Sequence, residues 1–283
     1  LEKIESASYF LKITASTIDD TLEFRTYYRY FKEHVNEEDV FIGSTFAAFQ
    51  VPDTTRMDYF YDGHARGNLN WNDKTVRIDS FKNNSLPFRP VSPPFFNYAR
   101  SIIKYSLETA DSISIDLNDF GDSIQFSLKI FNEVVEFFGN DFLYTDLKYI
   151  QGSPISRYEI WINKSTRLPY RVKRKMPHNT SINTCTLNKL SAARKDFLAS
   201  KYFPPDFSIT SSASVSQREK AAIHDLIGTV APDWLLTDAS SNRFSLKSFN
   251  KKILLIQFTG IGCGPCHASI PFLKQLVSDY AKK

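Results

Sequence analysis

Several residue types are scarce in this sequence, and each scarcity argues against a class of protein. Only 10 of the 283 residues are glycine, which argues against a low-complexity or loop-dominated chain. No run of about 18 apolar residues occurs, so we expect no transmembrane helix. Only two of the three cysteines lie close together in the sequence, and the histidines show no ligand spacing, so we expect no metal site.

The excess of positive charge is also small, at +4. A nucleic-acid-binding domain usually concentrates basic residues on one face, whereas here they are mostly interleaved with acidic ones, so we expect no nucleic-acid partner. The exception is the stretch 167–175, with five basic residues. On a strand, Arg171, Lys173 and Lys175 would share one face. We interpret that face as solvated, in preference to a site for an anionic partner.

Aromatic residues are abundant, with 24 Phe and 14 Tyr against 2 Met. This ratio predicts a core or a cavity lined by rings, each of which buries a large apolar area. The remaining composition is ordinary for a soluble globular protein, and the length is sufficient for two domains.

Residues 1–205 are predicted to be mostly strand. Leu22, Phe24, Tyr28 and Tyr30 alternate with charged residues, as in a half-buried strand. Further strands are predicted at 40–49, 56–61, 65–79, 113–117, 124–130, 158–162, 170–176 and 181–188. A helix should follow Pro93-Pro94, where apolar residues recur at helical spacing, and a second short helix is expected at 191–200. Together these elements predict a curved, half-barrel-like antiparallel sheet around a helix or a cavity.

Residues 158–172 read Tyr-Glu-Ile-Trp-Ile-Asn-Lys-Ser-Thr-Arg-Leu-Pro-Tyr-Arg-Val, and a Tyr-Asp-Gly turn lies at 61–63. With the succession of amphipathic strands, this pattern resembles the LolA-like superfamily of periplasmic lipoprotein carriers over most of residues 1–190. The resemblance implies an incomplete barrel, closed by helices, that shelters a lipid or acyl chain. An ordinary packed aromatic core is the alternative.

The composition changes near residue 206. Residues 206–223 are rich in serine and are predicted to be a linker between the β-rich domain, 1–205, and an α/β part, 224–283. In the latter part, the apolar run 253–258 predicts a buried central strand, and apolar residues between 267 and 280 predict an amphipathic helix. The predicted fold class is therefore α+β.

A dithiol motif, Cys263-Gly264-Pro265-Cys266, lies where the predicted strand leads into this helix. The amide groups and dipole of a helix N-terminus stabilise a thiolate, so Cys263 should be the attacking thiol. Cys266 can then resolve the mixed disulfide, and Pro265 restricts the turn between them. We predict a redox role for the pair, and weigh it against a purely structural disulfide.

The sequence around the motif resembles the TlpA/ResA-like branch of the thioredoxin superfamily. The matching residues are 228–234, 244–249, the Cys263–Cys266 motif and Pro271, which should kink the helix. The resemblance implies a thiol–disulfide oxidoreductase acting on a disulfide-containing or thiol client, with no cofactor. Three positions depart from the family pattern: Gly262 replaces Trp, Gln257 replaces a buried Asp, and Ser269 replaces a Glu of cytochrome-maturation members.

Other interpretations of the cysteines are less favoured. The motif with His267 also matches the C-x-x-C-H pattern of covalent haem attachment, but a buried strand leading into the motif argues against haem. Cys185 lies in a predicted strand and is expected to be a buried, inert thiol.

A thioredoxin fold needs further strands and helices beyond those that residues 224–283 supply, so we expect the natural protein to be longer than this chain. Two functions are kept open. The first is a cell-envelope thiol–disulfide oxidoreductase whose N-terminal domain binds a client or lipid. The second is a lipid- or lipoprotein-binding module with an accessory or inactive redox part. Both resemblances imply the periplasm or outer envelope of a diderm bacterium, with any targeting segment already absent.

Overall fold

The computed structural model describes residues 4–17, 25–39, 42–79, 94–145, 153–177, 179–191, 197–211, 228–238, 240–249, 254–257 and 264–280. Two compact units are formed, one by residues 1–212 with 261–283 and one by residues 213–260. Within the described ranges, no helix combines the length and apolar character needed to cross a membrane.

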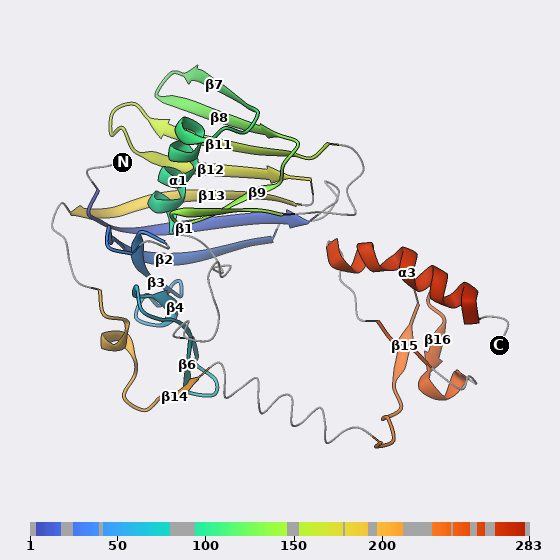
Figure 1. The fold of residues 1–283 in the computed structure, drawn as a ribbon. Coiled ribbons are helices and arrows are strands. Elements are labelled where there is room, and N and C mark those ends of the chain that lie inside the picture. Colours follow the sequence, from blue (N-terminus) through green and yellow to red (C-terminus); the bar gives the residue numbers. More distant parts are fainter. Residues whose placement is uncertain are drawn as a thin grey trace. The chain divides into compact units, whose positions relative to one another are not determined.

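One large sheet contains most of the strands in the first unit (Figure 1). Its order is β14-β6-β5-β4-β3-β2-β1-β13-β12-β11-β8-β7, and every neighbouring pair is antiparallel except β14 and β6. β7 and β14 are the two edges and do not pair with each other, so the sheet is open. The strands are β1 (Ser6–Thr17), β2 (Arg25–Val35), β3 (Ser44–Phe49), β4 (Met57–Tyr61), β5 (Arg66–Asn70), β6 (Thr75–Asp79), β7 (Ile113–Phe120), β8 (Ser123–Phe131), β11 (Ile155–Asn163), β12 (Pro169–Met176), β13 (Asn179–Ser191) and β14 (Ser208–Ser211).

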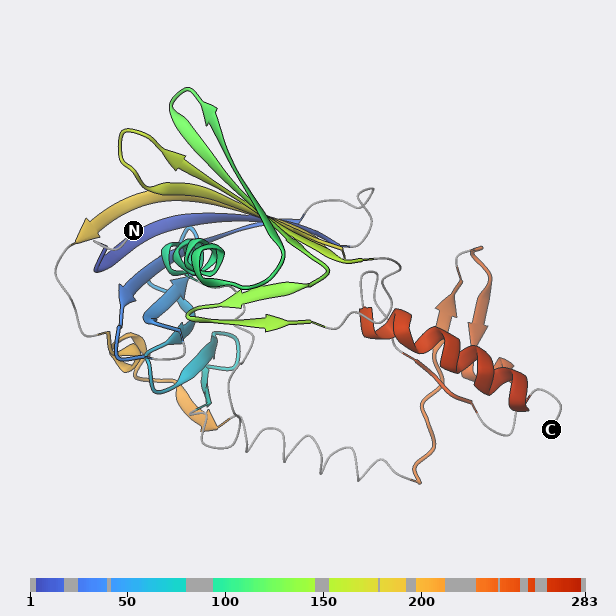
Figure 2. The same cartoon turned by 45° about the horizontal axis from the view of Figure 1, so that its top comes forward.

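Helix α1 (Phe95–Glu108) lies inside the curve of this sheet, as Figure 2 shows. The helix begins directly after Pro94, as the sequence predicts, because the fixed φ of proline suits a helix start. The hairpin of β9 (Val135–Phe138) and β10 (Asp141–Tyr144) lies against the other side of α1 (Figure 2). The open, curved antiparallel sheet around a helix confirms the predicted α+β class.

Two hydrophobic cores form on opposite faces of the sheet. The larger core lies between the concave face and α1, and the smaller one lies beneath residues 197–207. Strand β3 contributes to both cores: Phe46 and Ala48 belong to the first, and Ala47 and Phe49 belong to the second. Because both faces of this strand are covered, all six of its residues are buried.

Some elements differ from the sequence prediction. β1 and the β9–β10 hairpin were not predicted, and 65–79 forms two strands, β5 and β6, joined by a turn. Of the helix expected at 191–200, residues 192–196 lie outside the described residues, and a short 3₁₀ helix, η1 (Ala199–Tyr202), follows. Strand β14 pairs with β6, so these residues of the predicted linker, 206–223, belong to the sheet.

The C-terminal region contains the two-stranded sheet β15 (Leu235–Thr237) and β16 (Arg243–Ser245), the 3₁₀ helix η2 (Leu246–Ser248) and helix α3 (Gly264–Tyr280). Residues 254–257, expected within a buried central strand, have no strand pairing, and Leu254, Leu255 and Ile256 are exposed. A buried central strand needs hydrogen-bonded neighbours on both sides. The described strands nearest in sequence, β15 and β16, pair with each other and not with residues 254–257.

Candidate functional site

The dithiol motif lies at the start of α3. Helix α3 begins at Gly264, so Cys263 directly precedes it and Cys266 belongs to its first turn. Cys263 itself lies outside the described residues, as do the side chains of Pro265 and Cys266. The described backbone therefore places Gly264–Cys266 in a first helical turn, whose unpaired amide groups favour an anion.

Pro271 lies inside α3, as the sequence predicts. A proline in this position removes one backbone hydrogen bond and disturbs the helix at the preceding turn. The apolar side chains of α3 are only partly covered: Ile270, Phe272 and Val277 are exposed, while Leu273 and Leu276 are half-buried. Of the apolar stripe predicted for this helix, only Leu273 and Leu276 are partly covered in the structure.

Within the first unit, the concave side of the sheet is filled by aromatic rings. Tyr9 on β1 stacks on Phe31 of β2, with ring centroids 5.4 Å apart, and meets Phe96 of α1 edge-on at the same separation. Tyr158 on β11 contacts Phe137 of β9 edge-on at 5.0 Å. The aromatic richness of the sequence thus serves a packed core around α1, and any ligand space must lie at the margins of that core.

A buried carboxylate fixes the start of α1. The N-cap residue, Pro94, makes no side-chain cap. Instead Glu33 of β2 accepts hydrogen bonds from the amides of Phe96 (3.2 Å) and Asn97 (2.7 Å) and from the hydroxyl of Tyr9 (2.7 Å). Burial raises the pKa of Glu33 despite these three donors. Sequence alternation missed this residue because its partners lie 24 positions away in β1 and more than 60 positions away in α1.

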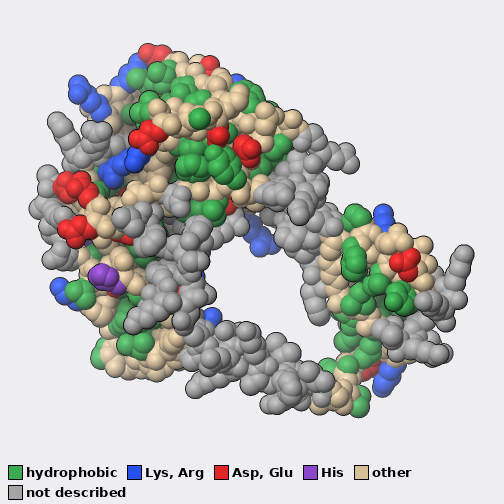
Figure 3. Space-filling view, in the orientation of Figure 1, with side chains coloured by type: hydrophobic (Ala, Val, Ile, Leu, Met, Phe, Trp, Pro, Cys, Tyr) green, Lys and Arg blue, Asp and Glu red, His purple; other side chains and the backbone are tan. Residues whose placement is uncertain are grey.

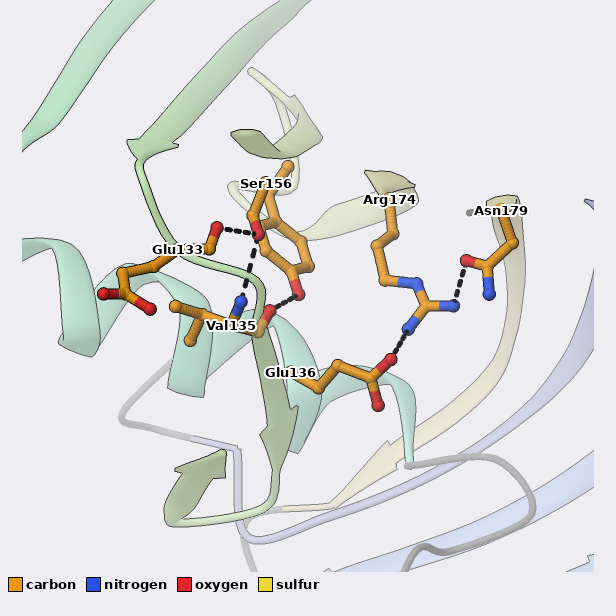
Figure 4. Close-up of polar contacts among 7 residues, drawn as sticks. Glu133, Val135, Glu136, Ser156, Arg174 and Asn179 are labelled. Atoms are coloured by element: carbon orange, nitrogen blue, oxygen red, sulfur yellow. Dashed lines mark hydrogen bonds and ion pairs between the residues drawn. The ribbon is translucent and has the colours of Figure 1, made fainter. Parts of the chain in front are cut away.

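The β9–β10 hairpin is held to the sheet by a second polar cluster, shown in Figure 4. Ser156 accepts from the amide of Val135 at 3.0 Å, and Arg174 donates to Glu136 at 3.2 Å and to Asn179 at 2.6 Å. The charged side chains are largely buried, with 15% of Arg174 and 8% of Glu136 exposed. Burial also raises the pKa of nearby Tyr98 to about 12, so this phenol stays neutral. The hairpin therefore depends on long-range polar contacts.

An uncovered apolar band continues the concave face beyond α1. Register places Ile115 and Leu117 of β7 on the same face as the core residues Leu128 and Phe126 of β8. Leu117 is nevertheless 69% exposed. Hydrophobic side chains gather over β7 and β8 in Figure 3. Such a band is unusual for a surface that meets only water.

A pocket of about 280 Å³ lies on the concave side, next to the start of α1. Its apolar wall is formed by Phe96, Leu168, Pro169, Tyr170, Cys185 and Leu187. Cys185 is buried, as predicted, and burial raises the pKa of its thiol well above the ordinary value. It is therefore a protonated, weakly nucleophilic group at neutral pH.

The convex face carries the basic stripe of β12. The guanidinium of Arg171 lies 4.6 Å from the ring centroid of Trp161, and Lys173 pairs with Glu159 at 3.3 Å. Both contacts are made with side chains of the neighbouring strand β11, and 30% of Lys173 is exposed, which agrees with the interpretation of a solvated strand face.

Comparison with known proteins gives partial similarities. No family model matches the sequence. The thiol–disulfide oxidoreductase ResA of Geobacillus kaustophilus is 32% identical over 65 residues, which is 23% of this chain and 36% of that protein. ResA of Bacillus thuringiensis is 33% identical over 57 residues, or 20% of this chain and 33% of that protein. Part of the chain is similar to ResA. The chain spans about a third of the length of these curated relatives.

Comparison with solved structures gives matches of low TM-score that extend over most of the chain. A LolA superfamily protein from Nitrosomonas europaea covers 73% of this chain and 96% of its own, with 12% identity and a TM-score of 0.29. The match to the Mycobacterium tuberculosis lipoprotein LppX covers 66% of this chain and 88% of LppX, with 7% identity and a TM-score of 0.30. The match to an uncharacterised protein from Thermus thermophilus covers 74% of this chain and 95% of that protein, with 8% identity and a TM-score of 0.34.

Proposed function

We propose that this chain acts as a thiol–disulfide oxidoreductase of the cell envelope, in the periplasm or outer envelope of a diderm bacterium. The observation that carries the proposal is the Cys263-Gly264-Pro265-Cys266 motif immediately before and within the first turn of α3, in a chain locally similar to ResA. In this proposal, residues 1–211 form a domain that binds a client or a lipid, and residues 224–283 form the redox part.

The proposed reaction is an exchange of disulfides. The Cys263 thiolate attacks one sulfur of a client disulfide, forming a mixed disulfide, and the other client sulfur leaves as a thiolate that takes up a proton. Cys266, after losing its proton, attacks the Cys263 sulfur and releases the second client thiol. The client gains two electrons and two protons, and Cys263 and Cys266 become a disulfide.

The first prediction concerns the redox equilibrium of the pair. In glutathione redox buffers, Cys263 and Cys266 should interconvert between dithiol and intramolecular disulfide with a midpoint above about −300 mV, because catalytic pairs are more oxidising than structural disulfides. Thiol alkylation followed by mass spectrometry measures the reduced fraction. Cys185→Ala should leave the midpoint unchanged, whereas Cys263→Ser should abolish the transition. A midpoint well below −300 mV would indicate a structural disulfide, and insulin reduction no faster than with Cys263→Ser would argue against the enzyme.

A second function, binding of an acyl chain on the concave side of the sheet, is favoured by the apolar pocket beside Leu187 and by the exposed band on β7 and β8. Such a chain would cover apolar groups that otherwise face water, with a gain of about 0.8 kcal/mol per buried methylene. The redox part would then be accessory.

The second prediction tests this binding with palmitate. Leu187→Arg should weaken palmitate binding by on the order of tenfold, because it places a charge in the wall of the pocket. Leu190→Arg is the matched control, since Leu190 lies on the same strand with the same exposed fraction, 39%, and does not line the pocket. Native mass spectrometry of the full chain measures the bound fraction. Equal effects of the two variants, or no palmitate on the unmodified chain, would rule out this site.

A further inference from the structure

A second pocket, of about 390 Å³, lies at the other end of α1, between the last turns of the helix and the β9–β10 hairpin. It is distinct from the dithiol motif and shares no lining residue with the apolar pocket at the start of the helix. Its volume lies in the usual range for sites of small ligands. Neither proposed function uses it.

One wall of this pocket is aromatic. The ring of Tyr105 on α1 meets Phe142 and Phe137 edge-on, with centroids 4.9 and 5.1 Å apart, and Phe142 meets Tyr144 at 5.5 Å. All four rings line the pocket. Clustered aromatic rings attract organic cations, because the ring faces carry negative charge density.

A carboxylate lies beside these rings. Asp111 accepts hydrogen bonds from the hydroxyl of Tyr105 and from that of Tyr144, the latter at 2.9 Å. The negative end of the α1 dipole also lies at this pocket. The last turn of the helix has no basic residue that would neutralise this partial negative charge. Negative charge, helix dipole and rings together favour an ammonium group at this wall.

Positively charged side chains of α1 also line the pocket. Arg100 and Lys104 lie one helical turn apart, and both belong to the lining. Lys104 pairs with Glu108 at 4.0 Å, but both side chains are about 60% exposed, 62% and 64%. An exposed pair of this kind is weak and readily exchanged for an anionic ligand. The two cations suit a phosphate, which accepts several charge-assisted hydrogen bonds.

We propose that this pocket binds a small zwitterion that carries an ammonium group and a phosphate a few bonds apart, the chemistry of phosphoethanolamine. The ammonium group lies against Asp111 and the aromatic wall, and the phosphate lies against Lys104 and Arg100. The ligand is either a free phosphoethanolamine or the headgroup of a lipid. This site is independent of the redox chemistry proposed for Cys263 and Cys266.

Isothermal titration of the full chain with O-phosphoethanolamine tests the proposal, with ethanolamine and inorganic phosphate as the two half-ligands. The zwitterion should bind at least about tenfold more tightly than either half, because only the zwitterion engages both walls. Asp111→Asn and Lys104→Gln should each weaken binding by on the order of tenfold. Asp116→Asn is the matched control, since Asp116 is an exposed carboxylate on β7 outside the pocket.

Thermal unfolding of each variant separates loss of binding from loss of fold, and Lys104, being exposed, should tolerate substitution without unfolding. Absence of saturable binding, equal binding of phosphate alone, or full binding by both Asp111→Asn and Lys104→Gln would overturn the site. Flotation with phosphatidylethanolamine vesicles, compared with phosphatidylglycerol vesicles, distinguishes a lipid headgroup from a free ligand; either source supports the site. Since the assay needs no thiol, it can succeed where the dithiol prediction fails.

Discussion

Replacing Glu33 with alanine is expected to lower the free energy of unfolding by about 3 kcal/mol, because three buried donors lose their acceptor. These donors are the hydroxyl of Tyr9 and the amides of Phe96 and Asn97, and all lie within 3.2 Å of the carboxylate. The amides belong to the first turn of α1, which has no side-chain cap of its own. Chemical denaturation at pH 7 measures the loss, and Glu37→Ala, at an exposed turn, should change stability by less than about 0.5 kcal/mol.

The conservative variant Glu33→Gln separates charge from hydrogen bonding. Burial raises the folded-state pKa of Glu33 above its ordinary value of about 4.3, so the folded protein holds this proton more tightly than the unfolded chain. The resulting stability is fully present below the unfolded pKa and is lost as pH rises through the folded pKa. Lowering the pH from 7 toward 4.5 should therefore stabilise the unmodified chain relative to Glu33→Gln. An opposite slope would mean that the three donors outweigh the cost of burial.

Local pattern was sufficient to predict much of this fold. Alternation identified β2, β8, β11 and β12, and Pro93-Pro94 located the start of α1, because period and proline geometry are properties of a few neighbouring residues. A helix over 267–280 was predicted for the same reason, and α3 contains it but begins three residues earlier, at Gly264. These features depend on contacts along the chain.

Long-range contacts account for what was missed. Glu33 is one charged residue in an alternating strand, and only the position of α1 makes it buried. Arg174 was counted among the basic residues of 167–175. Because successive residues of a strand point to opposite faces, Arg174 lies on the apolar face of β12, whereas Arg171 and Lys173 lie on the other face. That parity was a readable signal. The residue that pairs with it, Glu136, lies on β9, a strand too short to show a period.

The pocket at the end of α1 could not have been predicted from spacing. Asp111 and Tyr144 are 33 positions apart and meet because the β9–β10 hairpin folds back over the helix. The hairpin was not predicted, so the residues it brings to the pocket could not be grouped. The dithiol motif, by contrast, lies within four consecutive residues, so a redox role could be predicted from the sequence alone.

The hairpin itself should depend on the Arg174–Glu136 pair. Glu136→Ala is expected to lower the free energy of unfolding by about 3–5 kcal/mol, because Arg174 would remain buried without its carboxylate partner. Denaturant unfolding measures the global effect. Hydrogen exchange at Val135, whose amide donates to Ser156, reports whether the hairpin opens before the sheet unfolds.

A second ion pair that involves β12, between Lys173 and Glu159 of β11, provides the matched control. Lys173 and Glu159 are as close, at 3.3 Å against 3.2 Å, but lie on the convex face with 30% and 25% of their side chains exposed. Glu159→Ala should therefore cost no more than about 1 kcal/mol. The double variant Glu136→Leu/Arg174→Met should recover most of the loss, since apolar side chains of similar volume often replace a buried pair without penalty. Equal losses for Glu136→Ala and Glu159→Ala would show that burial of the pair does not determine its energy. If the buried pair behaves as expected, Arg174 and Glu136 hold in place the hairpin that supplies Phe137, Phe142 and Tyr144 to the pocket.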